Sequence, residues 1–517
     1  MKPAIFDIRD FGAVGDGTTL NTATIQSAID AANAAQGGIV FIPSGVFLCG
    51  TIELKSNVTL FLDTTAKLLG SPKAEDYHTG NNIPRSNGNV VFVSAARAEN
   101  ITICGNGTID GNGRAFFSGR GDNSGPGAST GQGNVERPHL IIFSECKNVR
   151  MNDVFLTASA YHCIRTLNCE YVYYERVRIH NRVNLNNDGF HFNGSRYVHI
   201  NGCDVKCQDD ACALFGSNQF ITVANSSFST RWSIFRFNTG DCKNITVTNC
   251  LIYETYGCVI KLNCRTGSHI ENLTFSNLIF RDVTGPITVG LNTPNRLLNP
   301  GETTPQDIER GTVRNITFSN IRGNVVANGR QFDDMHWTQG YRPGETRTCI
   351  TLNGVGEDFL ENIVLSNIHL TFEGGGTAEE AQLRDLPLIA GEYFEIGDRP
   401  AHGLYARNVR GLKLDNVRIV TATPDLRPAI ILDNVSDATL SGVTTQGNMD
   451  SPSVLRCINT TDVLISSPRL MTPAAVFLAV EGEHSDNITL ERGDIRKSAK
   501  TATFDRGATE KSLRFLE

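Results

Sequence analysis

Three carboxylates near the middle of the chain could share the acid and base roles of a hydrolytic reaction. Asp188 stands 21 and 22 positions before the neighbouring pair Asp209 and Asp210. Like charges held close together push their pKa values apart, so that one carboxyl keeps a proton near neutrality while another stays ionised. Hydrolysis of a glycosidic bond needs this division, because an acid protonates the leaving oxygen while a base activates water. Aspartate is also a common turn residue, and for any one of the three that alternative stands.

The carboxylates meet only if the strands that follow them stack in register. Four segments align so that one apolar residue of each is equivalent, at intervals of 22, 23 and 25 residues: Phe192, Leu214, Phe237 and Leu262. Because side chains alternate along a strand, the residue before each of these lines the outer face: His191, Ala213, Arg236 and Lys261. Asp188 and Asp210 then lie one coil apart, in the turn before their strands, with Asp209 beside them.

Two histidines and two cations join the candidate site. His162 lies near the start of an earlier outward segment and could line a cleft, although a hydrogen-bonded structural histidine fits the pattern equally well. His191 follows Asp188 by three residues on the outer face. Arg236 and Lys261 are expected one and two coils beyond the carboxylates, where they would bind substrate. Singly, each cation would be a solvated surface charge.

A repeat of 23 to 26 residues must position these side chains. Its central apolar residues are spaced 23, 26, 23 and 24 residues apart in one run and 26, 25 and 25 in another: Val149, Val172, Val198, Ile221 and Ile245, then Leu412, Ala438, Val463 and Ile488. Each repeat has no room for a helix, alternates apolar with polar residues and carries asparagine at its turns. This pattern predicts an all-β fold in which each repeat is one coil of a parallel β-solenoid. The Asn-X-Ser/Thr triplets are interpreted as turn asparagines rather than as glycosylation sites.

The N-terminal part and three insertions depart from the repeat. Residues 21–35 place Ile25, Ile29 and Ala32 on one face of a short helix, which is expected to cap the open end of the solenoid within the first 75 residues. The insertions cover residues 111–137, 327–347 and 374–403, and their side chains could wall a groove. None of them reads as a separate domain, so the sequence predicts a single domain over residues 1–517.

Composition excludes several classes of protein. The 517 residues carry 47 Lys and Arg against 54 Asp and Glu, a net charge of −7, whereas a general nucleic-acid binder needs a basic surface. No stretch approaches eighteen uninterrupted apolar residues, so no membrane span is predicted. The fourteen cysteines form no C-x-x-C pair, and neither a metal site nor a cofactor is predicted. Buried free thiols favour a reducing, cytoplasmic location, with secretion after loss of a signal peptide as the alternative.

With these residues placed, the chain resembles glycoside hydrolase family 28, the polygalacturonase and rhamnogalacturonan hydrolase group. The similarity runs from residues 6–13 through 107–111 and 137–138 to about residue 290. The family's Asn-Thr-Asp-Gly motif appears here as Asn186-Asn187-Asp188-Gly189, and its Gly-Asp-Asp motif as Gln208-Asp209-Asp210. The resemblance implies a right-handed parallel β-helix that hydrolyses with inversion. It also implies a general acid at Asp209 and a pair that activates water at Asp188 and Asp210.

Two other family motifs are only partly present. Where polygalacturonases have Gly-His-Gly, this chain has Trp232-Ser233-Ile234, so the histidine is missing. Where they have Arg-Ile-Lys, it has Val259-Ile260-Lys261, so only the lysine remains. In that family the two cations contact a galacturonate carboxylate, and Arg236 is the residue of this chain that could replace the missing charge.

The sequence therefore predicts an inverting, polygalacturonase-like glycoside hydrolase acting without a cofactor on pectin-derived or related plant oligosaccharides or polysaccharides. If the insertions close the groove, an exo-acting enzyme on short chains is favoured. One alternative is a polysaccharide lyase or epimerase, in which the three aspartates hold Ca²⁺ and Lys261 or Arg236 acts as base. The other is a non-catalytic carbohydrate-binding solenoid.

Overall fold

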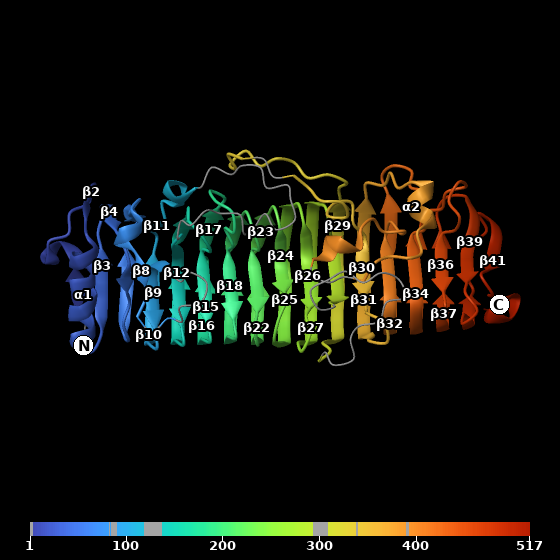
Figure 1. Cartoon of the computed structure of the whole chain (residues 1–517), viewed down its shortest axis with the longest axis horizontal. Helices are drawn as coiled ribbons and strands as arrows, with labels where there is room; N and C mark the ends of the chain where they lie inside the picture. Colours follow the sequence, from blue (N-terminus) through green and yellow to red (C-terminus); the bar gives the residue numbers. More distant parts are fainter. Residues whose placement is uncertain are drawn as a thin grey trace. The chain divides into compact units, whose positions relative to one another are not determined.

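The computed structural model describes residues 4–81, 83, 90–117, 137–292, 309–337, 340–388 and 392–516, and these residues are mostly strands (Figure 1). The chain divides into two compact units. Unit 1 comprises residues 1–235 and 331–340, and unit 2 comprises residues 236–330 and 341–517. The single domain over the whole chain stays a prediction.

Unit 1 is a stack of coils in which each strand pairs in parallel with its counterpart one coil away. One sheet contains β10 (Glu99–Gly105), β13 (Lys147–Asn152), β16 (Glu170–Glu175), β19 (Arg196–Asn201) and β22 (Gln219–Ala224). A second contains β11 (Thr108–Asp110), β14 (Phe155–Thr157), β17 (Arg178–Asn181), β20 (Asp204–Cys207) and β23 (Ser227–Thr230). The third contains β9 (Val90–Ala96), β12 (His139–Ser144), β15 (Ile164–Leu167), β18 (Phe190–Asn193) and β21 (Cys212–Phe215).

Unit 2 is built in the same way, with longer strands. Its main strands are β25 (Asp241–Thr255), β27 (His269–Val283), β29 (Thr312–Val325), β31 (Leu360–Phe372), β32 (Leu404–Asp415) and β34 (Ile430–Ser441). A neighbouring sheet holds β26 (Cys258–Cys264), β28 (Ile287–Leu291) and β30 (Ile350–Asn353). The predicted all-β class and right-handed parallel β-helix are confirmed.

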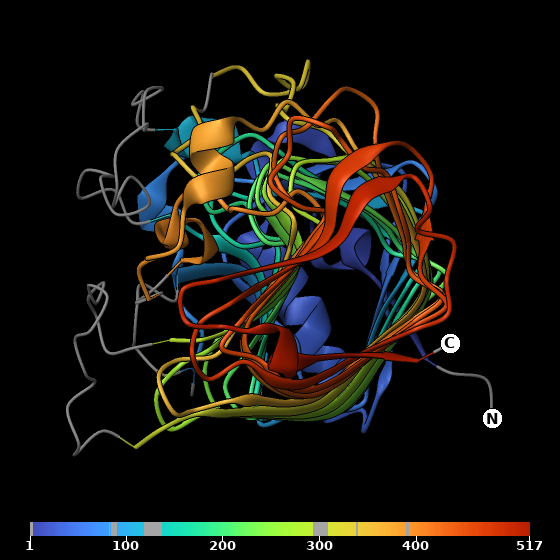
Figure 2. The ribbon, with the colours of Figure 1, turned by 90° about the vertical axis from the view of Figure 1, so that its right-hand side faces the viewer.

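The predicted N-terminal cap is present as α1 (Thr22–Ala34). Its apolar face is buried through Ile25, Ala28, Ile29 and Ala32, and Gln26 bonds to the backbone of Glu53 at both ends of its amide. In Figure 2 the blue helix lies within the outline of the N-terminal coils. The helix therefore covers apolar residues that the first coil would otherwise expose.

Asparagine ladders fix the corners of the coils. In unit 2, Asn315 donates from Nδ2 to Oδ1 of Asn272 at 3.1 Å, and its own Oδ1 accepts from Asn362 at 3.0 Å. In unit 1, Asn148 and Asn100 are joined in the same way at 2.8 Å. These asparagines have φ of 54 to 58°, a left-handed conformation that their side chains tolerate well. Their amide nitrogens are engaged in the ladder, as expected of turn asparagines.

All fourteen cysteines are free thiols, and only Cys104 is not fully buried. Burial raises the pKa of Cys203 and of Cys457 to about 12. The thiols therefore serve as small apolar residues, whereas the reducing compartment stays a prediction. Neither α1 nor the five-residue α2 (Ala378–Gln382) is long and apolar enough to cross a membrane, and no other α-helix occurs in the described ranges.

Two of the predicted insertions are described almost completely. Residues 327–347 lie between β29 and β30, and residues 374–403 lie between β31 and β32, where they form α2 and the short 3₁₀ helix η4 (Tyr393–Ile396). Of the first predicted insertion, residues 118–136 lie outside the described residues.

Candidate active site

Asp188 and Asp210 occupy equivalent positions in adjacent coils of unit 1. Strands β18 and β21 pair so that Phe192 lies opposite Leu214, which is the predicted register. Each aspartate stands two residues before its strand, in the turn, and the backbone N–H of Gly189 donates to the carbonyl of Asp210 at 2.9 Å. Neighbouring strands of a sheet lie about 4.8 Å apart, so the two carboxyl groups start from adjacent points of the backbone.

The turn that carries Asp188 is held from within by Asn187. The Oδ1 atom of this fully buried side chain accepts from the backbone of Val183 and Asn184, and its Nδ2 donates to the carbonyl oxygens of Ser159 and Tyr161. Glycine is required at position 189, directly after Asp188, because an added Cβ would lie 2.5 Å from the carbonyl oxygen of Ala211. Both residues belong to the motif identified in the sequence, and their structural task is to let the two aspartate turns stack closely.

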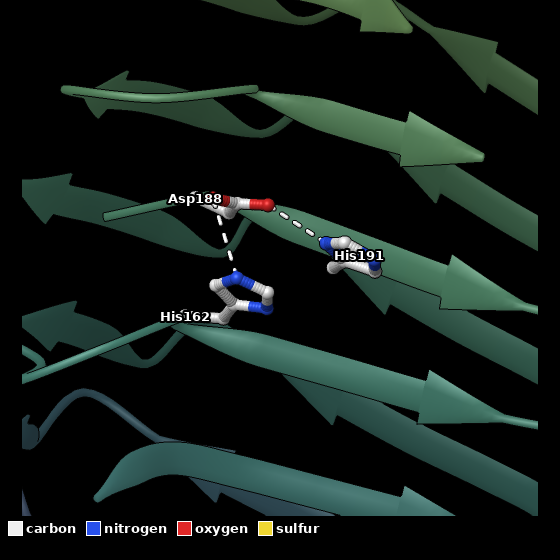
Figure 3. A group of neighbouring side chains, drawn as sticks. All are labelled: His162, Asp188 and His191. Atoms are coloured by element: carbon white, nitrogen blue, oxygen red, sulfur yellow. Dashed lines mark hydrogen bonds and ion pairs between the residues drawn. The ribbon is translucent and has the colours of Figure 1, made fainter. Parts of the chain in front are cut away.

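Asp188 is buried, with 5% of its side chain exposed, and lies between two histidines (Figure 3). His191 Nδ1 is 2.7 Å from Asp188 Oδ2, and His162 Nε2 is 3.7 Å from Oδ1. The two imidazole rings stack with centroids 4.6 Å apart and an angle of 12° between their planes. A carboxylate in this setting is desolvated and oriented by the hydrogen bond from His191.

The stacked rings of His191 and His162 are the start of a column of imidazoles, and a third histidine extends this column on the side away from Asp210. His139 is fully buried one coil before His162, and their ring centroids are 5.0 Å apart. Burial and the neighbouring positive groups lower the pKa of both His139 and His162 well below the usual value, so that both rings are neutral near pH 7. His162 therefore presents a neutral ring to Asp188 rather than a permanent positive charge.

Among the residues that the structure describes, one group of side chains could hold a metal ion. It consists of His162, Asp188 and His191, whose ligand atoms lie within 4.8 Å of one another. Zinc, however, binds imidazole nitrogen at about 2.0 to 2.1 Å along the lone pair, which lies in the plane of the ring. Two rings stacked almost in parallel direct their lone pairs side by side rather than toward one point. The arrangement therefore suits an oriented carboxylate better than a metal centre.

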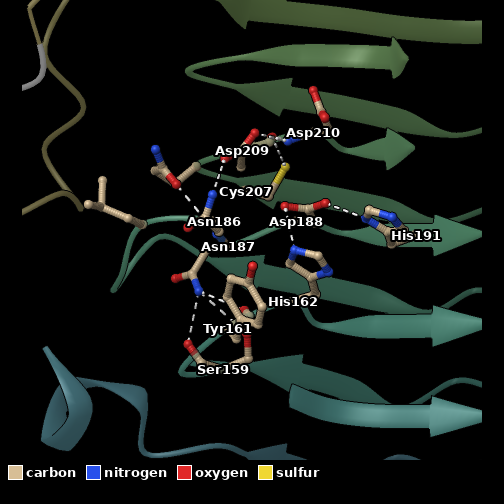
Figure 4. Close-up of polar contacts among 12 residues, drawn as sticks. Ser159, Tyr161, His162, Asn186, Asn187, Asp188, His191, Cys207, Asp209 and Asp210 are labelled. Atoms are coloured by element: carbon tan, nitrogen blue, oxygen red, sulfur yellow. Dashed lines mark hydrogen bonds and ion pairs between the residues drawn. The ribbon is translucent and has the colours of Figure 1, made fainter. Parts of the chain in front are cut away.

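Asp209 is half-buried and lies at the end of a chain of hydrogen bonds (Figure 4). Asn186 donates from Nδ2 to Asp209 Oδ2 at 3.3 Å, and its Oδ1 accepts from Arg137 at 3.1 Å. The backbone N–H of Asp210 donates to the other oxygen of Asp209 at 2.9 Å. Burial lowers the pKa of Arg137 to about 10, against the opposing influence of Tyr161, Asp188 and Asp209, so that its charge persists at neutral pH.

A segment of the second predicted insertion lies against these coils. Asp334 is 2.7 Å from His180 Nε2 and 3.1 Å from Nη1 of the buried Arg182, whose Nε donates to the carbonyl of Cys207. Burial opposes ionisation of Asp334, but His180 and Arg182 outweigh it and lower the pKa of Asp334 below the usual range. The guanidinium of Arg182 also lies 3.6 Å from the centre of the Phe332 ring. Residues 331–337 are thus tied to the strands that carry the aspartate turns.

The predicted cations Arg236 and Lys261 lie in unit 2 and share one partner that the sequence did not single out. Arg236 Nη2 and Lys261 Nζ are each 2.7 Å from a different oxygen of Glu392. The structure therefore brings the two cations together, around a carboxylate supplied by the protein. Their part in substrate binding stays a prediction.

A groove walled by the insertions stays a prediction, and three of their side chains make the following contacts. His402 is buried, with Nδ1 3.0 Å from the carbonyl of Arg427 and 3.9 Å from Asp425. His336 and Trp337 pack against Phe117, with ring centroids 4.8 and 5.4 Å away.

Comparison with known proteins gives one family match and several partial relatives. The family model described as glycosyl hydrolases family 28 matches residues 34–333, which is more than half of the chain. An exo-poly-alpha-D-galacturonosidase of Dickeya chrysanthemi is 51% identical over 75 residues, which cover 14% of this chain and only 12% of that relative. An exopolygalacturonase of Arabidopsis thaliana is 26% identical over 341 residues, covering 63% of this chain and 74% of the relative.

Among solved structures, the family 28 exopolygalacturonase of Yersinia enterocolitica superposes with a TM-score of 0.56. The aligned parts are 20% identical and cover 91% of this chain and 78% of the other. At this level of identity the likeness concerns the fold.

Proposed function

This chain belongs to glycosyl hydrolases family 28, and we propose that it hydrolyses a glycosidic bond with inversion of the anomeric carbon. The substrate in this proposal is a pectin-derived or related plant oligosaccharide or polysaccharide. The observation that carries the proposal is the stacking of Asp188 on Asp210, with Asp209 beside them and hydrogen-bonded to Asn186. Inverting hydrolysis uses one carboxyl group as acid and another as base, and this acidic cluster could supply both.

The proposed roles follow from the surroundings of each carboxyl group. Asp209, which is half-buried, protonates the leaving oxygen. Asp188 accepts a hydrogen bond from His191 and, together with Asp210, removes the proton of the attacking water. Arg137 acts through Asn186 to orient Asp209, and it supplies positive charge near the acidic cluster. All of these groups lie in unit 1.

The proposal includes the exo mode of attack. It rests on the similarity to an exo-poly-alpha-D-galacturonosidase of Dickeya chrysanthemi and an exopolygalacturonase of Arabidopsis thaliana. A product time course on a long polymer tests the mode. Release of single small products from the outset fits the proposal, and mid-chain cuts from the outset contradict it.

The lyase or epimerase alternative fits the contacts less well. It needs a cation of the chain as base, but both Arg236 and Lys261 are held by Glu392. It also needs Ca²⁺ on the aspartates, whereas Asp188 is already paired with His191. Activity that survives EDTA, without an unsaturated product absorbing in the ultraviolet, would exclude this alternative.

The decisive experiment is a panel of defined oligosaccharides with and without uronic acids, followed by NMR of the first product formed. We expect the anomer opposite to that of the cleaved bond. Retention of configuration would contradict the inverting mechanism, and the absence of hydrolysis on every substrate would favour the non-catalytic carbohydrate-binding solenoid.

A further inference from the structure

Glu392 holds the two cations that would otherwise be the best candidates to bind an acidic sugar. One carboxylate oxygen of Glu392 forms an ion pair with Arg236 Nη2, and the other forms an ion pair with Lys261 Nζ, each at 2.7 Å. Both cations come from strands of the β-helix, whereas Glu392 comes from the insertion at residues 374–403. The insertion thus brings a carboxylate to a pair of strand cations more than a hundred residues earlier in the chain.

The three charges are poorly solvated. The side chain of Lys261 is fully buried, and those of Arg236 and Glu392 are only 15% and 21% exposed. Burial opposes the ionisation of Glu392, but Arg236 and Lys261 outweigh it, so that the pKa of Glu392 falls to about 2. Glu392 therefore carries a full negative charge throughout the physiological pH range, and opposite charges at this distance attract strongly because little water screens them.

The position of Glu392 is fixed by the residues that follow it. Tyr393 is fully buried and donates from its hydroxyl to the carbonyl of Glu345 at 2.9 Å. The buried Arg399 donates to the carbonyl of Tyr393 at 2.6 Å and to that of Gly344 at 2.9 Å. The ammonium of Lys261 also lies 5.4 Å from the centre of the Tyr393 ring. Displacing Glu392 would disturb this anchorage and separate a desolvated ammonium from its counter-charge.

We propose that Glu392 is a specificity-determining residue that makes the sugar site of Lys261 select a neutral sugar over a uronate. The inference rests on the proposed hydrolase function and on the resemblance that assigns Lys261 to substrate binding. The protein's own carboxylate stands where a substrate carboxylate would pair with the cations. A uronate would bring a second anion toward Glu392 and would have to displace it, whereas a neutral sugar meets no such repulsion.

The test uses matched oligosaccharides that differ only at C6: oligogalacturonides and their carboxyl-reduced, neutral counterparts. For the wild-type chain we expect kcat/KM to be about tenfold or more higher on the neutral form. Glu392→Gln keeps the size of the side chain and removes its charge. It should raise kcat/KM on the uronate form by about tenfold or more, mainly through a lower KM, and change the neutral form little.

Two further variants control the experiment. Asp398→Asn removes an exposed carboxylate from the same insertion and should leave the preference unchanged. Glu392→Asp keeps the charge and should keep the rejection of uronate. A wild-type preference for the uronate form would overturn the proposal, and this comparison needs no variant to fold. Equal kcat/KM values of wild type and Glu392→Gln on the uronate form would overturn it as well.

A binding measurement separates this proposal from the proposed hydrolysis. Calorimetric titration with galacturonate and with galactose should show weaker binding of galacturonate to wild type than to Glu392→Gln, whether or not any bond is cleaved. If neither oligosaccharide is hydrolysed but this difference is found, the hydrolase function fails and the role of Glu392 stands. If hydrolysis occurs and both proteins bind galacturonate equally, the role of Glu392 fails alone.

Discussion

His191 Nδ1 and Asp188 Oδ2 are 2.7 Å apart, in a setting where both side chains are more than nine-tenths buried. The strand geometry places His191 on the same face as the turn that carries Asp188, and the Phe215 ring packs edge-on against the imidazole at 4.9 Å. A hydrogen bond from a ring that cannot rotate freely fixes the direction in which the Asp188 carboxylate faces.

The first prediction concerns this bond. His191→Phe keeps an aromatic ring that can stack on His162 but removes the donor to Asp188. We expect kcat to fall by about tenfold or more, with KM little changed, because the carboxylate that activates water loses its orientation. Steady-state kinetics on the best substrate of the panel measures the effect. His199→Phe, which replaces a ring on β19 that bonds Thr222, is the matched control and should retain full activity. An unchanged kcat in His191→Phe would exclude the positioning role.

The second prediction assigns the general acid. Asp209→Asn should lower kcat by about a thousandfold or more while binding of oligosaccharide persists, because an amide cannot supply the proton to the leaving oxygen. Asp204→Asn changes the same functional group at an exposed position of unit 1 and should have no effect. Substrates with a good leaving group need less protonation, so they should be affected far less. Loss of activity on all substrates to the same degree would argue against an acid role.

The third prediction concerns the asparagine ladder of unit 2. Asn315→Ala removes two side-chain hydrogen bonds and puts alanine at a φ of 58°, so we expect unfolding in urea to require about 2 kcal/mol less free energy. Asn315→Gly loses the same bonds but adopts this φ without strain, and should cost about half as much. If the two variants are equally destabilised, the backbone conformation contributes nothing to the effect.

The fourth prediction concerns acid stability. Burial opposes ionisation of Asp425, but its bonds to Arg427 lower the pKa of Asp425 from 3.8 to about 2. Because the folded-state pKa lies below the unfolded one, the carboxylate stabilises the fold above about pH 4, and this contribution is lost as the pH falls toward 2. Its size is about 2 kcal/mol, obtained from about 1.4 kcal/mol for each pKa unit.

Melting temperatures recorded between pH 7 and pH 2 test this fourth prediction. Asp425→Asn should lower the melting temperature at pH 7 and flatten its fall below pH 4, whereas Asp437→Asn, at an exposed corner of unit 2, should follow the wild-type curve. An Asp425→Asn curve parallel to that of wild type would mean that the Arg427 pair does not govern acid stability.

The repeat explains why the register of the aspartates could be predicted. Each coil must bury its apolar residues in one column, and a slip of one residue would expose them, so the spacing of Phe192 and Leu214 determines the stacking of Asp188 and Asp210. The cap at α1 follows from the same requirement, because an uncovered end coil would expose apolar side chains.

The partners supplied by the insertions could not be predicted in this way. Glu392 reaches Arg236 across 156 residues, and Asp334 reaches Arg182 across 152. Neither carboxylate stands in the repeat, and no periodic pattern relates an irregular segment to a particular coil. The resemblance predicts a role for the cations, but no pattern in the sequence indicates that a carboxylate of the chain pairs with them. Arg137 stands in one of the segments that resemble the family, but its bond to Asn186 depends on the conformation of a turn.

The buried cysteines allow local opening of this protein to be followed without added labels. Alkylating reagents attack the thiolate, and burial has made thiolate formation at Cys203 and Cys457 very unfavourable while also shielding the sulfur from collision. A thiol becomes reactive only when its own coil separates from its neighbours. Mass-spectrometric mapping of the order in which cysteines are alkylated would therefore rank the coils by their local stability, without any labelling site having to be introduced.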